Sequence, residues 1–449
     1  MINLLCQIDQ CVMTLLQMRE AKAGRITPEM EQIAKNEKVS VELIRKGIAD
    51  GRIVIFKSNT SNANPLGIGE GLSVKINSNI GASQKVYDIH HEIKKAEISV
   101  QYGADTVMDL TSGPTEQGIR DVRKAILAHI EVPLGTVPMY QIALRAIEKS
   151  GGIVNMTEDD MFSVVEEQAK EGVDFFTIHA GVTKHLAEYI KKNPRYMGIV
   201  SRGGTITAVW TLENDQENPF YTNYDYLLEM AQEYDFSLSL GDGFRPGCIF
   251  DSTDYPQVQE LLTLSKLVKR AHEKDVQVIC EGPGHIPAHQ IAENIRLQKS
   301  LTNGAPFYVL GPLVTDIAPG YDHIVGAIGG VIAGMNGVDY LCYVTPAEHL
   351  GLPNLEEVKE GVIAFKIAAH AIDLTRNWDV ASTWDRKMDR ARKDLDWNEQ
   401  IKCAIDPEKA KRIRERDGPI ERSEPCTMCG SLCAIKILED SIRKDKDKE

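Results

Sequence analysis

Short apolar runs rich in β-branched residues alternate with amphipathic helical stretches over more than half of this chain. This alternation predicts parallel strands joined by crossover helices, because parallel neighbours need a long connection between them. About eight such repeats in roughly 270 residues is the size of a (β/α)8 barrel. We therefore predict an α/β fold of this type, with candidate strands at residues 74–80, 106–110, 134–139, 175–178, 197–200, 237–240, 276–280, 307–310 and 340–344.

One of these candidate strands is surplus to an eight-stranded barrel. We interpret run 74–80 or run 134–139 as the surplus one, serving as an added strand or as a plug at the bottom of the barrel. An open doubly wound sheet is the alternative, but that fold normally has a glycine-rich phosphate-binding turn after its first strand. The glycine-rich stretch 67–71 comes before a run instead. The barrel is therefore favoured.

Helical patterns flank the predicted barrel. Thr27 followed by Pro28 predicts a helix start, with a capping residue and a proline at the first helical position. Residues 39–48 continue the helical pattern, and the Asn- and Ser-rich stretch 58–65 predicts a loop. We predict three parts: an N-terminal helical domain at 1–70, the barrel with its site at 71–375, and a C-terminal helical segment at 376–449.

The composition of the chain restricts the kinds of partner that it can bind. The chain has 449 residues and a formal net charge of −14 at pH 7. Nucleic acids and anionic membranes attract basic surfaces, so this charge argues against either partner. No apolar run approaches the ~18 residues of a membrane span, and the first residues do not resemble a leader peptide. The nine cysteines suit a reducing compartment and metal chemistry, so we predict a cytoplasmic protein.

A cluster of thiols near the end of the chain is the most specific local signal. Cys426, Cys429 and Cys433 have the spacing C-x2-C-x3-C. A structural zinc site uses four ligands, whereas a cubane iron–sulfur cluster held by three cysteines keeps one iron open. The spacing leaves two alternatives: a zinc knot completed by Cys403, and a group of buried free thiols.

Polar side chains gather where the predicted strands end, which is where barrel enzymes place their active sites. The segment 201–204 offers backbone N–H groups, a hydroxyl and a guanidinium, a combination that holds phosphate, and Arg245 is a second clamp. The strand-end residues are Asn77, Asn79, Met108, Asp109, Tyr140, Gln141, His179, Ser201, Arg202, Gly203, Gly204, Asp242, Arg245, Glu281, His285, Tyr308, Glu348 and His349.

Two of these strand ends suggest a metal. Glu281 and His285 share a rigid turn, and Glu348 with His349 follows the last run. Two histidines from different strands, with coordination positions left open, suit a divalent ion that gathers oxygen ligands of a substrate or cofactor. A hydrogen-bonded structural histidine is the alternative at each position.

Long motifs follow one another in a fixed order along the predicted barrel. They include Gly135-Thr136-Val137-Pro138, Thr177-Ile178-His179-Ala180-Gly181, Ser201-Arg202-Gly203-Gly204, Ser239-Leu240-Gly241-Asp242-Gly243, Glu281-Gly282-Pro283-Gly284-His285 and Cys342-Tyr343-Val344-Thr345-Pro346. In these motifs the chain resembles the phosphomethylpyrimidine synthase family, over about residues 15–437.

The resemblance implies a (β/α)8 barrel and a C-terminal segment in which Cys426, Cys429 and Cys433 hold a [4Fe-4S] cluster. The open iron of that cluster binds S-adenosylmethionine and cleaves it reductively to a 5′-deoxyadenosyl radical, using an external electron donor. The implied substrate is 5-aminoimidazole ribotide, and His285 with His349 would bind zinc. The implied substrate contacts are Asn79, Met108, Tyr140, His179, Ser201, Arg202, Gly203, Asp242, Gly243, Phe244, Arg245, Glu281 and Tyr308.

The resemblance also implies an assembly. Members of the family are homodimers in which the cluster segment reaches the neighbour's barrel, and pairing with a paralogous chain is the alternative. Such an enzyme is a radical S-adenosylmethionine carbon–carbon lyase acting on a small molecule.

Several strand-end positions depart from the usual pattern of the family, namely Ser78, residues 111–114, Phe244 and Gly326. Because such changes can redirect a radical rearrangement, we favour the 5-hydroxybenzimidazole synthase branch, whose product becomes the lower ligand of an anaerobic cobamide. The swap from a hydroxyl to glycine at Gly326 is expected to open space in the pocket. The alternative is the thiamin-pathway enzyme, which makes hydroxymethylpyrimidine phosphate from the same ribotide. A non-radical zinc lyase and a ribotide-binding protein without catalysis are more remote alternatives.

Overall fold

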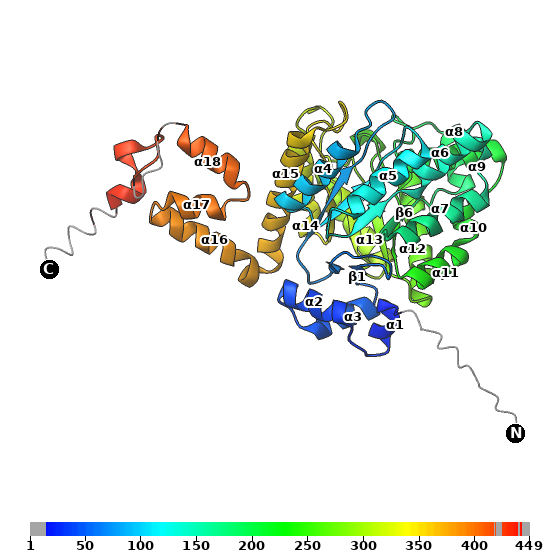
Figure 1. The fold of residues 1–449 in the computed structure, drawn as a ribbon, viewed down its shortest axis with the longest axis horizontal. Coiled ribbons are helices and arrows are strands. Elements are labelled where there is room, and N and C mark those ends of the chain that lie inside the picture. The colour runs from blue at the N-terminus through cyan, green and yellow to red at the C-terminus, as the bar shows by residue number, and fades with distance from the viewer. Residues whose placement is uncertain (1–14, 417, 419–423, 439–440, 442–449) are drawn as a thin grey trace, which may run out of the picture. The chain divides into compact units, whose positions relative to one another are not determined.

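Eight parallel strands close into a barrel within the residues that the structure, a computed structural model, describes: 15–416, 418, 424–438 and 441. Figure 1 shows the helices arranged around the outside of these strands. The (β/α)8 prediction is confirmed, and the open-sheet alternative is wrong because the strands close into a ring. In pairing order the strands are β10 (Tyr340–Cys342), β3 (Lys75–Ile80), β4 (Thr106–Asp109), β5 (Leu134–Thr136), β6 (Phe175–Ile178), β7 (Ser237–Leu240), β8 (Val278–Gly282) and β9 (Phe307–Leu310), which pairs with β10.

The barrel strands have no solvated face. β4, β6 and β7 are buried along their whole lengths. Their outer faces pack against the surrounding helices and their inner faces fill the barrel, so parallel strands of this kind carry continuous apolar runs.

The surplus run is 197–200, not one of the two that the sequence suggested. Both suspected runs contain regular barrel strands, β3 and β5, so that prediction is wrong. The carboxylate of Asp251 accepts the N–H groups of Tyr196 and Met197, each at 2.9 Å, which removes them from any strand ladder. Gly198 has a φ of +67°, in the left-handed region, and this breaks the extended conformation.

Several helices around the barrel begin at capping residues. Thr157 forms a capping box with Asp160, and the side chains of Thr115 and Asp254 each accept a backbone N–H of the first helical turn. The helices are α4 (Ile89–Tyr102), α5 (Glu116–Leu127), α6 (Pro138–Ser150), η1 (Ile153–Asn155), α7 (Glu158–Glu171), α8 (Lys184–Lys192), α9 (Arg202–Asn214), α10 (Pro219–Thr222), α11 (Tyr224–Tyr234), η2 (Ile249–Asp251), α12 (Tyr255–Glu273), α13 (Ala288–Leu301) and α14 (Asp322–Met335).

The N-terminal residues close one end of the barrel. The ring of Phe56 stacks on Phe175 with ring centroids 4.2 Å apart and meets Tyr340 edge-on. Because Phe175 and Tyr340 begin their strands, this cluster lies at the N-terminal end of the barrel, opposite the end used by active sites. The predicted helices are present, but the sequence analysis missed the antiparallel pair of strands. The elements are α1 (Gln17–Lys22), α2 (Pro28–Glu37), α3 (Val41–Ala49), β1 (Ile53–Phe56) and β2 (Leu66–Gly69).

Residues 370–449 form a second compact unit, whose boundary falls within α15 (Leu355–Arg376). The described part of this unit is helical, as predicted for the C-terminal segment. The indole N–H of Trp384 donates to the Cys403 carbonyl at 2.7 Å, and that of Trp397 donates to the Glu424 carbonyl at 2.8 Å. Its elements are α16 (Trp378–Lys393), α17 (Trp397–Cys403), α18 (Pro407–Glu415) and η3 (Gly430–Leu432).

The division of the chain into three domains stays a prediction.

No helix in the described ranges is long and apolar enough to cross a membrane.

Candidate active site

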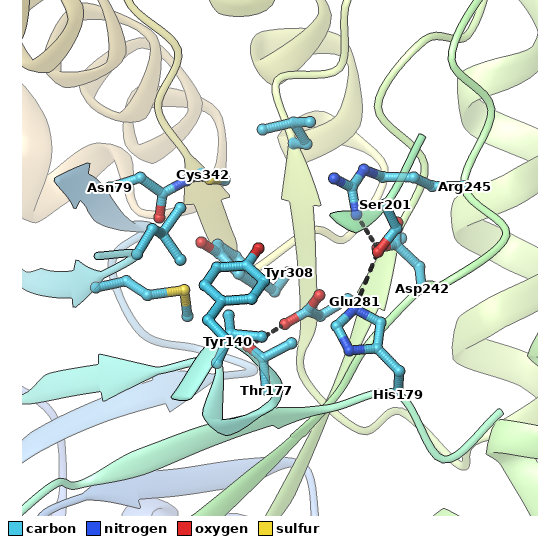
Figure 2. A pocket seen from close by; sticks show the side chains of 15 residues that line it. Asn79, Tyr140, Thr177, His179, Ser201, Asp242, Arg245, Glu281, Tyr308 and Cys342 are labelled. Carbon is cyan, nitrogen blue, oxygen red and sulfur yellow. Dashed lines mark hydrogen bonds and ion pairs between the residues drawn. The ribbon is translucent and has the colours of Figure 1, made fainter. Parts of the chain in front are cut away.

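A pocket opens at the C-terminal ends of the barrel strands, with about 500 Å³ of space that includes open solvent. Figure 2 shows the side chains that line it, pointing toward one another from different strands. Among the predicted substrate contacts, the pocket is lined by Asn79, Met108, Tyr140, His179, Ser201, Asp242, Arg245, Glu281 and Tyr308. Its other lining residues are Leu110, Val137, Thr177, Gly282, Leu310 and Cys342.

The carboxylate of Glu281 is fixed by hydroxyl groups on the two preceding strands of the barrel. Thr177 Oγ1 on β6 and Ser239 Oγ on β7 each donate to Glu281 Oε1 at 2.7 Å. Burial raises the pKa of Glu281, and these hydrogen bonds oppose that rise because they favour the ionised form. Both hydroxyls bind the same oxygen, which holds the carboxylate in one orientation at the pocket wall. Figure 2 shows the Thr177 contact.

His179 follows β6 and contacts the start of α9. Ser201 Oγ accepts the N–H of Gly204 at 3.1 Å and lies 3.0 Å from His179 Nε2. Which of the two groups donates in this contact depends on the tautomer of the ring, and His179 Nδ1 is buried without a hydrogen-bond partner among the described residues. Burial lowers the pKa of His179 to about 3, so the ring is neutral near pH 7. His179 is therefore a neutral imidazole whose Nε2 contacts Ser201.

Asp242 and Arg245 lie in the turn after β7. Asp242 Oδ1 is 3.4 Å from Arg245 Nη1. Burial raises the pKa of Asp242 well above its usual range, and the charge of Arg245 opposes the rise. Asp242 Oδ2 is buried and has no hydrogen-bond partner among the described residues. Because the Asp242–Arg245 contact is long and one carboxylate oxygen has no partner, the two side chains can bind a ligand that carries both donors and acceptors.

A polar network covers the pocket wall from β3 to β9. Asn77 Nδ2 donates to Asn79 Oδ1 and to the hydroxyl of Tyr308, both at 2.7 Å. Asn79 Nδ2 lies 2.9 Å from the Sγ of Cys342. Burial raises the pKa of Cys342 to about 12, so this side chain is a thiol, not a thiolate, at neutral pH.

Four predicted contacts, Arg202, Gly203, Gly243 and Phe244, do not line the pocket. The exposed guanidinium of Arg202 sits 4.9 Å from the ring centroid of Tyr140. Gly203 lies against His179, because an added Cβ would come within 2.3 Å of the imidazole ring. Gly204 packs equally closely on Gly243, where an added Cβ would come within 2.6 Å of the backbone. These glycines therefore permit the close contact between α9 and the turn after β7.

Other strand-end residues have structural partners. Asp109 accepts the N–H of Thr111 at 2.9 Å, and Gln141 accepts from Arg123 at 3.0 Å. Glu348 is exposed. None of these three side chains lines the pocket.

His285 and His349 come together in space, with ring centroids 5.1 Å apart. His285 Nδ1 lies 2.8 Å from a carboxylate oxygen of Asp316, and His349 Nδ1 lies 2.9 Å from one of Asp322. Carboxylates on Nδ1 orient histidines whose other nitrogen binds a metal, so this pair fits a two-histidine site. No group of three or more His, Cys, Asp or Glu side chains suited to a metal occurs in the described ranges. Further ligands would have to come from substrate or water.

The cysteine motif lies on a tightly turned segment of the second unit. The Gly430 N–H donates to the Cys426 carbonyl at 3.0 Å, and the Cys433 N–H donates to the Gly430 carbonyl at 3.2 Å. Cys429 is exposed, whereas Cys403 is buried at the end of α17. Three soft thiols on one short segment suit an iron–sulfur cluster.

Sequence reasoning missed Thr177, Ser239 and Cys342. Alternate residues of a barrel strand face its interior, and Thr177 lies two positions before His179. Counting back two positions from His179 would have found Thr177, whereas Ser239 lies three positions before Asp242 and this count would not have found it.

The substitutions that favoured the benzimidazole branch lie away from the pocket lining. Ser78 Oγ is 2.7 Å from the hydroxyl of Ser99 on α4, and Thr111 Oγ1 accepts a backbone N–H. An added Cβ at Gly326 would come within 2.8 Å of Val344, so the expectation that this glycine opens space is wrong. The side chain of Phe244 is fully buried in an apolar cluster around α8.

The fold and the pocket define a barrel enzyme acting on a small polar molecule, with a separate cysteine-bearing unit. The model of the Radical SAM ThiC family matches residues 16–440. The chain belongs to this family.

Curated relatives match nearly the whole chain. Phosphomethylpyrimidine synthase 2 from Methanothermobacter thermautotrophicus is 53% identical over 428 residues, covering 95% of this chain and 100% of its own. Phosphomethylpyrimidine synthases from Methanocaldococcus jannaschii and Pyrococcus furiosus are 52% and 54% identical, each covering 95% of this chain and 99% of their own. A solved dihydropteroate synthase from Thermus thermophilus has a TM-score of only 0.39 at 14% identity, covering 66% of this chain and 92% of its own.

Proposed function

We propose that this chain is a phosphomethylpyrimidine synthase, which converts 5-aminoimidazole ribotide into hydroxymethylpyrimidine phosphate. The observation that carries the proposal is the barrel pocket, which gathers most of the predicted ribotide contacts in one place. Relatives that carry this name and are more than 50% identical to the chain support it. The benzimidazole product loses its main support because the departures from the family pattern lie outside the pocket lining.

The phosphate of the ribotide is proposed to bind at the start of α9. The N-terminus of a helix attracts anions, and α9 begins here with Ser201 as its capping residue, although the Gly204 N–H is already bound by Ser201 Oγ. Arg202, stacked over Tyr140, and Arg245 supply guanidinium groups on either side. Glu281 is proposed to accept N–H groups of the aminoimidazole, since a carboxylate is an acceptor only.

The cofactors are proposed to be a [4Fe-4S] cluster on Cys426, Cys429 and Cys433, and S-adenosylmethionine. When bound, they supply a 5′-deoxyadenosyl radical, with one electron from an external donor. The side chains of the pocket orient the ribotide so that one ribose hydrogen is presented, and the barrel walls exclude water. A homodimer is proposed as the assembly.

The first prediction concerns the product of the reaction. Purified protein with 5-aminoimidazole ribotide, S-adenosylmethionine and a strong reductant, under anaerobic conditions, is expected to yield hydroxymethylpyrimidine phosphate as the main product by mass spectrometry. If 5-hydroxybenzimidazole is the main product, the proposed product is wrong and the chain is a member of the 5-hydroxybenzimidazole synthase branch. Absence of 5′-deoxyadenosine would reject radical chemistry altogether.

Arg202→Lys tests the phosphate site. Lysine keeps the charge but loses the planar fork and the stacking on Tyr140, so ribotide affinity should fall about tenfold. Calorimetry with 5-aminoimidazole ribotide measures this. Substrate-independent cleavage of S-adenosylmethionine is the control and should stay near the wild-type rate. Unchanged ribotide affinity would place the phosphate beside Arg245 instead.

Zinc is proposed to bind at His285 and His349. His285→Ala should lower zinc affinity about a hundredfold, because one of the two protein ligands is lost. Titration of metal-free protein with zinc measures this directly. His129→Ala, at an exposed histidine on the outside of the barrel, is the matched control. If the wild type, His285→Ala and His129→Ala all bind zinc equally, the two histidines of the proposed site are structural.

A further inference from the structure

The turn that presents Asp242 and Arg245, here called the β7 turn (residues 242–245), is held from behind by a buried carboxylate. Glu260 on α12 is only 2% exposed and does not line the active-site pocket. The Gly243 N–H donates to Glu260 Oε1 and the Phe244 N–H donates to Oε2, both at 2.8 Å. Both oxygens of one carboxylate are thus bound to consecutive backbone groups of the β7 turn.

A buried cation holds the carbonyl groups of the same turn. Arg195 Nη1 donates to the Phe244 carbonyl at 3.1 Å and to the Arg245 carbonyl at 3.4 Å. The Arg195 side chain is 3% exposed and forms an ion pair with Asp254 at 2.7 Å. Two N–H groups of the β7 turn are therefore bound by a carboxylate, and two of its carbonyl groups by a guanidinium.

The β7 turn is closely packed on both sides. An added Cβ at Gly243 would lie 2.2 Å from the side chain of Val182 and 3.1 Å from Glu260 Oε1. On the other side, Gly204 of the proposed phosphate site packs directly on Gly243. A shift of the turn away from Glu260 would therefore displace either the phosphate site or the Asp242 and Arg245 side chains.

The chemistry of Glu260 suits positioning better than simple packing. A buried carboxylate is costly unless it is paired and hydrogen-bonded, and a neutral amide could accept at only one of its two atoms. Burial raises the pKa of Glu260 to about 8, while the two N–H groups and the charges of Arg195 and Arg245 favour the ionised form. The ionised form accepts both N–H groups at once, so with a pKa of about 8 the clamp is expected to tighten as the pH rises through that value.

We propose that Glu260 and Arg195 are positioning residues that clamp the β7 turn, so that Asp242 and Arg245 keep the geometry needed to bind the substrate. The identity of that substrate, 5-aminoimidazole ribotide, rests on the proposed function. The clamp itself is a property of the free protein and can be measured without any ligand.

Hydrogen exchange of the free protein tests the clamp. In Glu260→Gln one of the two backbone N–H groups faces an amide donor, so exchange over residues 241–247 should become about tenfold faster. Glu273→Gln, an exposed position on the same helix, is the matched control and should exchange as wild type does. Wild-type exchange in a folded Glu260→Gln protein would overturn the clamp.

Ribotide calorimetry tests the functional consequence. Glu260→Gln and Arg195→Lys should each bind 5-aminoimidazole ribotide about tenfold more weakly than wild type, with little change in melting temperature. In an Arg245→Gln background the Glu260→Gln effect should become clearly smaller, because one of the two positioned groups is already absent. Fully additive losses would mean that Glu260 acts elsewhere and would overturn the positioning role. If wild type binds no ribotide, the proposed function fails, while hydrogen exchange still decides the clamp.

Discussion

Replacing Cys426, Cys429 or Cys433 by serine is expected to abolish the iron–sulfur cluster and to slow S-adenosylmethionine cleavage by about a thousandfold or more. The three thiols lie on one short segment, so removing any of them leaves two thiolates, which cannot hold a cubane firmly. Iron and acid-labile sulfide analysis after anaerobic reconstitution measures the cluster. Chromatography of 5′-deoxyadenosine measures the cleavage.

Cys403→Ser is the matched control for these variants. The Cys403 thiol is buried at the end of α17, and its carbonyl is bound by Trp384. Cluster content and cofactor cleavage should both stay near wild type in this variant. Loss of the cluster there would favour an arrangement with four cysteine ligands, and a zinc-only, colourless protein would end the radical proposal.

Glu281→Gln is expected to weaken 5-aminoimidazole ribotide binding about a hundredfold, since hydrogen bonds to buried charged groups are the costly ones to lose. Thr177 and Ser239 both donate to Glu281 Oε1. In glutamine one atom of the pair becomes a donor, so either the hydroxyls or the ligand meets the wrong group. Calorimetry of the purified protein measures this without turnover.

Thr177→Val tests the orientation of the Glu281 carboxylate without removing its charge. Valine keeps the shape of threonine but removes one hydroxyl donor from Glu281, so ribotide affinity should fall only about tenfold. Glu273→Gln again serves as the exposed control, with no expected loss. Should Glu281→Gln bind the ribotide as tightly as wild type, Asp242 becomes the better candidate for the carboxylate that accepts from the ring.

The amino-acid sequence by itself determined the barrel, the C-terminal helical segment and most of the pocket-lining residues. Its information on the fold is local: apolar runs such as 175–178 specify buried strands, and capping residues such as Thr157 specify where helices begin. Closure of parallel strands then places every strand end at one mouth, so residues as distant in sequence as Asn79 and Tyr308 could be assigned to one pocket.

The tertiary structure alone decided features that depend on a partner far away in the chain. Residues 197–200 have a strand-like sequence, but Asp251 binds the preceding backbone and the segment stays irregular. Nothing near Glu260 in the sequence indicates that it binds the β7 turn. Likewise, only packing showed that Gly326 faces Val344, because the side of an element on which a residue lies depends on what packs against it.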